Sequence, residues 1–243
     1  FENKHNLYHG GSDTFRELAQ YDYVMFPNKH TASRIRPFVT EDQLYVLGSP
    51  RYNSEWLAVL TEIRPDKTVP FGDNLNIVFF LRKENYFVSK QEVKRTIRLL
   101  DAFPTVQTII KEHPRDRLLD ASFADDMENV EIVKDGIPSA SLVNWGDVFL
   151  SLGTTITFEP IMRHKPVLGL EYCHSNYMTI SEYLRNSDVR SKDDLYHWIH
   201  EFLQESTEEF YHTDDLQRFK NEIITAEKSS VLAAWAERIE SFC

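Results

Sequence analysis

The feature that most constrains the fold is a series of short apolar runs that recur along the chain, with helix-like segments between them. The first run, NIVFFL at Asn76–Leu81, is apolar almost throughout, as in strands buried on both faces of a parallel sheet. In the segment that follows, Val93, Ile97 and Leu100 recur at helical spacing. Ser89 stands just before this segment, where an N-cap is expected. Together the two segments predict one β-α unit.

Four further runs follow the same pattern and predict four more strands. They are VQTIIK at Val106–Lys111, NVEIVK at Asn129–Lys134, DVFLSL at Asp147–Leu152 and PVLGLEY at Pro166–Tyr172. Strands that alternate with helices pair in parallel through right-handed crossovers. The sequence therefore predicts an α/β fold with an open, Rossmann-type parallel sheet, which binds its ligands at the carboxyl ends of the strands.

The rest of the chain predicts part of a second domain and a helical tail. Residues 1–63 contain strand-like YDYVMFP and QLYVLGSPRYN and the helix-like start TASRIRPFV. Residues 64–74, with two prolines and a glycine, predict a linker. We then expect the Rossmann-like domain over 75–204 and a C-terminal helical tail over 205–243. Because the chain opens at Phe1 without an initiator methionine, we expect a fragment of a longer protein.

Composition argues against several classes of protein. The 243 residues, 42% of them hydrophobic, can supply the core of one large or two ordinary domains. A formal net charge of −11 argues against a general nucleic-acid binder. No apolar run reaches the roughly 18 residues that span a bilayer, and the N-terminus lacks the order of a secretory signal. Cys173 and Cys243 lack the spacing of a metal or disulfide framework, so we expect a reducing, cytoplasmic setting.

Polar residues follow three of the predicted strands. They are Arg82 and Lys83 after the first strand, His113 and Arg115 after the second, and Gly153, Thr154 and Thr155 after the fourth. Because parallel strands deliver their C-terminal ends to one edge of the sheet, we expect these residues to lie close together. At the fourth strand, SLGTTITFEP predicts a strand-to-helix turn. There the glycine, the threonine hydroxyls and the free N–H groups of the helix suit an anionic phosphate.

Glu159 comes about one helical turn inside the predicted helix. It would lie on the face that also carries Thr155, where its carboxylate can accept hydrogen bonds from ribose hydroxyls. Simpler explanations exist for all these residues. A lone histidine such as His113 is more often structural than catalytic, the threonines can cap the helix, Glu159 can complement the helix dipole, and Arg82 and Lys83 can be solvated charges. Their joint placement at one edge favours the functional interpretation.

No metal-binding motif follows a predicted strand. Asp125 and Asp126 sit in a loop-like stretch that is typical of solvated surface. We therefore expect chemistry without a metal or another cofactor.

Several segments resemble the GT-B glycosyltransferases that build bacterial surface polysaccharides. KEHPRD and NWGDVFLSLGTTITFEPIMRHKPVLGLEY resemble their C-terminal, nucleotide-binding domain, and YHGGSD and VLGSPRYNSEW resemble segments of CDP-glycerol glycerophosphotransferases and capsule-biosynthesis relatives. An HP pair after the second strand and two small hydroxylated residues after the fourth also mark CMP-Kdo transferases and bacterial sialyltransferases. The resemblance is continuous over residues 76–203 and patchy before them.

The resemblance implies roles for the residues at the sheet edge. His113 contacts the donor phosphate and assists departure of the leaving group, with Arg115 as an electrostatic partner. Thr154 and Thr155 hold the phosphate, and Glu159 holds the ribose or base of the nucleotide.

The resemblance also extends to the N-terminal segment and to the activity. His9, in YHGGSD, stands where the glycerophosphotransferases place a general base, although a loop histidine beside flexible glycines is an equal alternative. We expect a metal-independent GT-B glycosyltransferase that moves a sugar from a nucleotide-sugar donor, CMP-Kdo or another CMP-sugar, to a saccharide or lipid-linked glycan of lipopolysaccharide or capsule. The threonines replace a usual serine pair, which leaves the donor open.

Alternative functions are a CDP-glycerol or CDP-polyol phosphotransferase, a UDP-sugar epimerase, and a non-catalytic GT-B scaffold inside a larger polysaccharide-synthesis enzyme. We expect a cytoplasmic protein, with any attachment to the inner face of the membrane made through other domains or partners.

Overall fold

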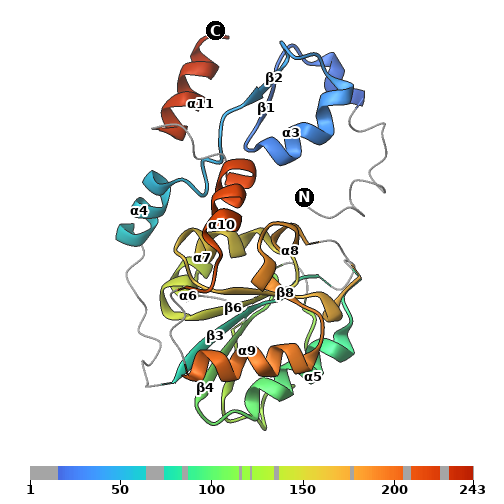
Figure 1. The fold of residues 1–243 in the computed structure, drawn as a ribbon, viewed down its shortest axis with the longest axis vertical. Coiled ribbons are helices and arrows are strands. Elements are labelled where there is room, and N and C mark those ends of the chain that lie inside the picture. The colour runs from blue at the N-terminus through green and yellow to red at the C-terminus, as the bar shows by residue number, and fades with distance from the viewer. Residues whose placement is uncertain are drawn as a thin grey trace. The chain divides into compact units, whose positions relative to one another are not determined.

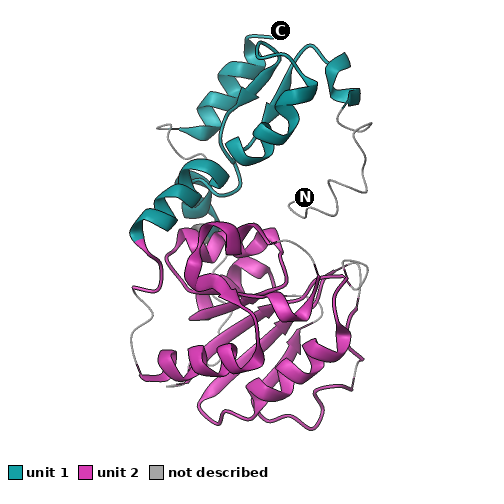
Figure 2. Ribbon diagram, turned by 45° about the vertical axis from the view of Figure 1, so that its right-hand side comes forward, with its two compact units in different colours: residues 1, 3–63, 213–243 teal, residues 2, 64–212 magenta. Residues whose placement is uncertain are grey.

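The computed structural model describes residues 16–63, 74–83, 87–114, 117–120, 122–133, 137–175, 178–204, 209–224 and 230–242 (Figure 1). The predictions for His9, for Arg115 and for residues 64–73 of the linker lie outside these ranges. The chain divides into two compact units, of which one joins Asn3–Ile63 with Thr213–Cys243 and the other contains Arg64–His212 (Figure 2). We predicted a separate tail over 205–243, whereas most of that stretch groups with the N-terminal segment.

The larger unit is built on a six-stranded parallel sheet with the strand order β5-β4-β3-β6-β7-β8. Its strands are β3 (Leu75–Phe80), β4 (Val106–Lys111), β5 (Val130–Val133), β6 (Val148–Ser151), β7 (Val167–Leu170) and β8 (Asp188–Val189). All five predicted strands are present, within two residues of their predicted ends. The predicted α/β fold with a Rossmann-type parallel sheet is thus confirmed. β8 was missed because two residues do not form a recognisable apolar run.

Helices cover both faces of this sheet. They are α5 (Lys90–Asp101), α6 (Ser139–Trp145), α7 (Phe158–Met162), α8 (Thr179–Tyr183) and α9 (Lys192–Gln204). Figure 1 shows α5 and α9 on one face, and α6, α7 and α8 on the other. The Ser89 side chain accepts a hydrogen bond from the Glu92 N–H and caps α5 as predicted. Val93, Ile97 and Leu100 of this helix are fully buried, in a core shared with β3, β4 and α9.

Backbone hydrogen bonds join the loop that follows β3 to the loop that follows β7. Val88 forms an antiparallel bridge with His174. The Ser89 N–H donates to the Cys173 carbonyl at 2.7 Å, and the Ser175 N–H donates to the Phe87 carbonyl at 3.3 Å. Because β6 lies between β3 and β7 in the sheet, this connection passes across the end of β6. We call it the loop bridge.

The smaller unit holds a two-stranded parallel sheet formed by β1 (Val24–Phe26) and β2 (Leu44–Val46). Its helical elements are η1 (Glu17–Gln20), α3 (Lys29–Ile35), η2 (Arg36–Phe38), α4 (Ser54–Ile63), α10 (Thr213–Phe219), η7 (Lys220–Ile224) and α11 (Val231–Glu240). The Trp235 indole N–H donates to the Gly48 carbonyl at 2.9 Å, and the rings of Tyr23 and Phe242 stack at 3.6 Å. These contacts explain why the C-terminal helices belong to this unit.

Candidate functional site

The turn that follows β6 is fixed by the last residue of the strand. Ser151 is completely buried, and its hydroxyl accepts hydrogen bonds from the N–H groups of Gly153 at 3.1 Å and Thr154 at 3.4 Å. Gly153 adopts a φ of +82°, a left-handed conformation that glycine adopts far more readily than other residues. The predicted glycine turn is therefore present, and Ser151, which we did not predict as a site residue, holds it in shape.

Arg82 reaches this turn from the end of the neighbouring strand β3. Its Nη1 donates to the Gly153 carbonyl at 2.8 Å and lies 3.5 Å from the Leu152 carbonyl. A Cβ atom added to Gly153 would lie only 2.9 Å from the same nitrogen. Arg82 is only 9% exposed, which is unusual for an arginine. The structure therefore places its positive charge directly against the turn, and its contact with a donor phosphate stays a prediction.

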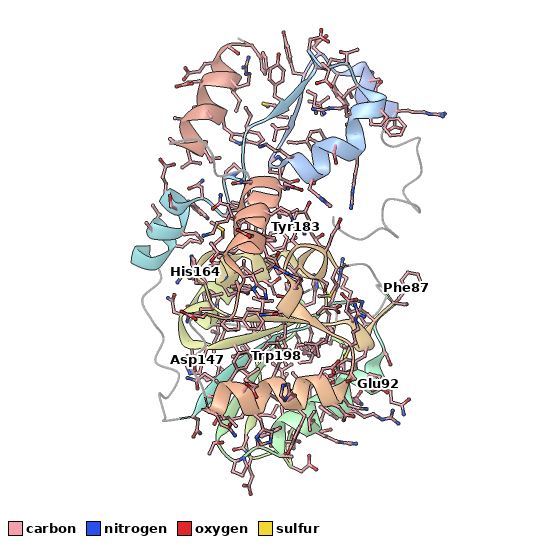
Figure 3. The ribbon with its side chains drawn as sticks, in the orientation of Figure 1. Phe87, Glu92, Asp147, His164, Tyr183 and Trp198 are labelled. Atoms are coloured by element: carbon pink, nitrogen blue, oxygen red, sulfur yellow. The ribbon has the colours of Figure 1, made fainter. Side chains whose placement is uncertain are left out.

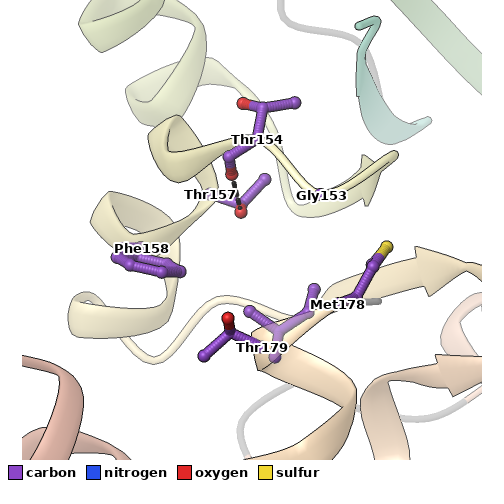
Figure 4. A pocket seen from close by; sticks show the side chains of 7 residues that line it. Gly153, Thr154, Thr157, Phe158, Met178 and Thr179 are labelled. Atoms are coloured by element: carbon purple, nitrogen blue, oxygen red, sulfur yellow. Dashed lines mark hydrogen bonds between the residues drawn. The ribbon is translucent and has the colours of Figure 1, made fainter. Parts of the chain in front are cut away.

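A small pocket opens beside the turn (Figure 4). One wall is formed by Gly153, Thr154, Thr157 and Phe158, and the other by Met178, Thr179 and Ile180 at the start of α8. The pocket is partly open to solvent, and its cavity volume is about 10 Å³, which is room for about one water molecule. The pocket combines threonine hydroxyls with apolar side chains at the carboxyl end of β6.

The helix after the turn differs from the predicted one. A 3₁₀ turn, η4 (Thr155–Thr157), comes first, and α7 then has only five residues. The Thr154 carbonyl accepts hydrogen bonds from the N–H of Thr157 at 3.3 Å and from its hydroxyl at 2.5 Å. The Thr154 side chain makes no capping hydrogen bond. Because peptide dipoles add along a helix, so short a helix contributes less to phosphate binding than we expected.

Glu159 does not line the pocket. It is 4% exposed, and its Oε1 accepts a hydrogen bond from Nη2 of Arg163 at 3.1 Å. Arg163 is also hydrogen-bonded to the side chain of Asn144 in α6. A buried carboxylate requires such a partner, so the structure gives Glu159 a structural contact, and its predicted contact with ribose remains untested.

His113 follows β4 in a loop that depends on its neighbour Glu112. His113 is half-buried, whereas Glu112 is 3% exposed. Oε1 of Glu112 accepts a hydrogen bond from the Leu119 N–H at 3.1 Å, which ties together the two ends of the loop. Its Oε2 is buried and has no hydrogen-bond partner among the residues that the structure describes. β4 and β6 both pair with β3, so the His113 loop and the Gly153 turn lie at the same edge of the sheet.

The other predicted site residues are placed as follows. Lys83, after β3, is half-buried, and Thr155 is half-buried in η4 without lining the pocket. Within the described ranges, no group of three or more His, Cys, Asp or Glu side chains is arranged to hold a metal ion. The helices in those ranges include none that is both long and apolar enough to cross a membrane.

Two more groups near the pocket were not predicted. Met178 forms part of its wall, and Glu171, in η5 (Glu171–Cys173), follows β7 at the same edge. The Ser181 hydroxyl donates to Oε1 of Glu171 at 2.6 Å, while burial raises the pKa of this carboxyl above its ordinary value of 4.5. Met178 belongs to no motif that the sequence shows, whereas Glu171 lies within the segment that resembles the GT-B enzymes but was given no role there.

Comparison with known proteins gives fold likeness without sequence likeness. No family model matches this chain, and no curated protein sequence does. The UDP-GlcNAc 2-epimerase of Neisseria meningitidis, solved with UDP-GlcNAc, matches with a TM-score of 0.62 and 15% identity over 91% of this chain and 61% of that one. The wall teichoic acid polymerase TagF (H548A) matches with a TM-score of 0.60 and 15% identity over 92% and 58%.

A third structure is Anabaena Alr3699/HepE in complex with UDP-glucose, with a TM-score of 0.54 and 12% identity over 96% of this chain and 68% of that one. The chain spans only 61% and 58% of the length of the epimerase and TagF structures. At such low identity the likeness shows the fold alone. It supports the predicted GT-B-like fold, but it gives no support to the finer resemblance to CMP-Kdo transferases.

Proposed function

We propose that the larger unit binds the nucleotide part of an activated sugar donor at the Gly153 turn, and that the protein is a GT-B transferase of bacterial surface-polysaccharide synthesis. The observation that carries this proposal is the pocket at the carboxyl end of β6, lined by Gly153 and Thr154. Open α/β sheets bind their ligands at this edge. The epimerase and HepE structures, which contain UDP-GlcNAc and UDP-glucose, support a nucleotide-sugar as the ligand.

The chemistry of transfer explains the residue types at this edge. The bond between the sugar carbon and the phosphate oxygen breaks, and its electron pair stays on the phosphate. Fixed hydrogen-bond donors and positive charge stabilise that oxygen. Thr154 supplies a hydroxyl, Arg82 supplies a charge behind the turn, and His113 assists the departing phosphate. The acceptor hydroxyl attacks the sugar carbon and gives its proton to a base, for which His9 is our candidate.

The identity of the donor is the finer part of the proposal. We favour a CMP-sugar such as CMP-Kdo, because the His113-Pro114 pair and the two threonines are arranged in the order found in those transferases. TagF supports the alternative of a CDP-polyol phosphotransferase, and the Neisseria enzyme supports a UDP-sugar epimerase. A scaffold that binds no donor is the non-enzyme alternative.

Calorimetric titration of the protein with CMP, CDP and UDP tests the proposal. We expect one of them to bind and Thr154→Ala to weaken its binding about tenfold, as expected for a hydrogen bond to a charged group. Thr105→Ala is the matched control, since Thr105 is exposed and precedes β4 at the opposite edge of the sheet. Absence of binding by all three nucleotides would refute a nucleotide-binding function.

Activity assays separate the alternatives. In a transferase, His113→Ala should lower the rate of transfer by about 10²–10⁴-fold, as for loss of an acid or base. An unchanged rate would make His113 structural. An epimerase would instead convert a UDP-N-acetylhexosamine without any acceptor, and a scaffold would show neither activity.

A further inference from the structure

We propose that Met178 determines the specificity of this pocket, because its thioether occupies the space over Gly153 and Gly169 into which a phosphate group would bind. The inference rests on the proposed function and extends it from the residues that bind the donor to the residue that limits its size.

The first argument is the position of Met178 over two adjacent strand ends. Gly153 follows β6, and Gly169 lies in β7, where it pairs with Ser151. A Cβ atom on Gly153 would lie 3.4 Å from Cγ and 3.6 Å from Sδ of Met178. A Cβ atom on Gly169 would clash with the Met178 methyl group. The two glycines therefore leave open a space at the carboxyl edge of the sheet, and the Met178 side chain fills it.

The second argument is the small size of the remaining space. Met178 is 2% exposed, and Figure 4 shows it facing the Gly153 turn across the pocket. About 10 Å³ remains beside it, which holds about one water molecule. A phosphate group is larger than a water molecule. The cavity beside Met178 can hold a phosphate only when one of its walls moves.

The third argument is that Met178 is the wall residue best suited to move. Thr179 and Ile180 lie within α8, whereas Met178 precedes that helix as its N-cap residue with extended backbone. Methionine is unbranched and has three side-chain torsions, so its side chain adapts to new shapes at small energetic cost. Its Sδ lies 2.8 Å from Nε2 of His174, and a thioether is only a weak hydrogen-bond acceptor. A phosphate can therefore displace it.

The position of Met178 has a consequence for donor choice. A side chain that must rotate to admit one phosphate opposes a diphosphate more strongly. Shortening the side chain should therefore favour CDP and UDP over CMP, and enlarging it with a rigid ring should weaken the binding of all three.

The test is calorimetric titration of CMP, CDP and UDP into the wild-type protein, Met178→Ala and Met178→Phe. Relative to the wild type, we expect Met178→Ala to bind CDP and UDP about fivefold more tightly with a smaller gain for CMP, and Met178→Phe to lose about tenfold in affinity for all three. Met127→Ala is the matched control, because Met127 packs against the core of the same unit and does not line the pocket. Its affinities should equal those of the wild type.

The outcomes separate this inference from the proposed function. If the wild-type protein binds a nucleotide but both Met178 variants keep its affinities, Met178 does not limit the pocket, while the nucleotide site stands. If the wild type binds none of the three, the proposed function fails and this inference fails with it. Thermal unfolding identifies a variant that does not fold. Should Met178→Ala be such a variant, the affinities of Met178→Phe decide, since unchanged binding by that variant overturns the inference.

Discussion

The turn after β6 and the loop after β4 lie at the same edge of the sheet, but different contacts stabilise them. We call these two segments the β6 exit and the β4 exit. The exit of β6 is held by neutral hydrogen bonds from Gly153 and Thr154 to the buried hydroxyl of Ser151, and by Arg82 on the Gly153 carbonyl. The exit of β4 depends on Glu112, whose one oxygen accepts the Leu119 N–H and whose other oxygen is buried without a partner in the described part of the chain. The comparison teaches that the turn lining the pocket is strongly constrained, whereas the histidine loop depends on one buried carboxylate.

The largest effect should come from Gly153→Ala, which changes the turn after β6. Because Gly153 has a positive φ and an added Cβ would lie close to the Arg82 nitrogen, the substitution should reduce the free energy of unfolding by about 1–3 kcal/mol, as measured by urea denaturation. Nucleotide binding should be lost, because the turn must shift. Gly48→Ala is the control, since Gly48 also has a positive φ, of +91°, but lies in the other unit. Retained binding by Gly153→Ala would show that the turn is not the site.

Removal of the carboxylate at the β4 exit should have the next largest effect. Glu112→Ala leaves the Leu119 N–H without its acceptor, which should reduce the free energy of unfolding by about 1–2 kcal/mol and, under the proposed function, slow transfer through displacement of His113. Glu112→Gln keeps an oxygen acceptor and should restore most of both. Glu131→Ala, at an exposed position of β5, serves as the control. If the glutamine variant were as impaired as the alanine variant, the charge rather than the hydrogen bond would matter.

Ser151→Ala should have a smaller effect on stability and a clear effect on binding. It removes the hydroxyl that accepts from two N–H groups of the turn, and we expect a loss of about 1 kcal/mol together with weaker nucleotide binding. Ser89→Ala removes the cap of α5 and should lose a similar amount while binding nucleotide normally. Equal binding by the two variants would contradict a role for Ser151 in shaping the site.

The smallest effect concerns Glu171, which follows β7 at this edge and whose Oε1 accepts a hydrogen bond from the Ser181 hydroxyl. Burial raises its pKa above the ordinary 4.5, so the folded state keeps this proton to higher pH than the unfolded state. Its contribution to stability is therefore fully present below pH 4.5 and is lost as the pH rises through the folded-state pKa. Glu171→Gln should match the wild type in urea denaturation at pH 4 and exceed it slightly at pH 7. A variant less stable than the wild type at pH 7 would contradict this.

The sequence predicted the sheet well and the site only in part. Apolar runs mark buried strands directly, so β3 to β7 were placed within two residues. Gly153 and Thr154 were predicted from their position after a strand, and they line the pocket. Glu159 was expected on the same face as Thr155 from α-helical spacing, but the 3₁₀ turn at η4 has about three residues per turn. That change of pitch alters the direction of every later side chain, including Glu159.

The remaining residues gave weaker signals. A serine at the end of the buried run DVFLSL requires a hydrogen-bond partner, and this was a signal for Ser151 that we did not use. Met178 reaches the pocket from a segment about 25 residues after Gly153, and no local pattern indicates such a contact. The C-terminal helices were predicted as amphipathic, but periodicity shows only that a helix buries one face. It cannot show which unit covers that face.

The loop bridge gives the pocket a connection to the molecular surface. Met178 contacts His174, and His174 pairs with Val88. The residue before Val88 is Phe87, which is 52% exposed (Figure 3). Rotation of the thioether would change the environment of the imidazole and, through the paired backbone, that of the phenyl group. Phe87 thus offers a spectroscopic reporter on the surface, where ring resonances could record events inside the pocket.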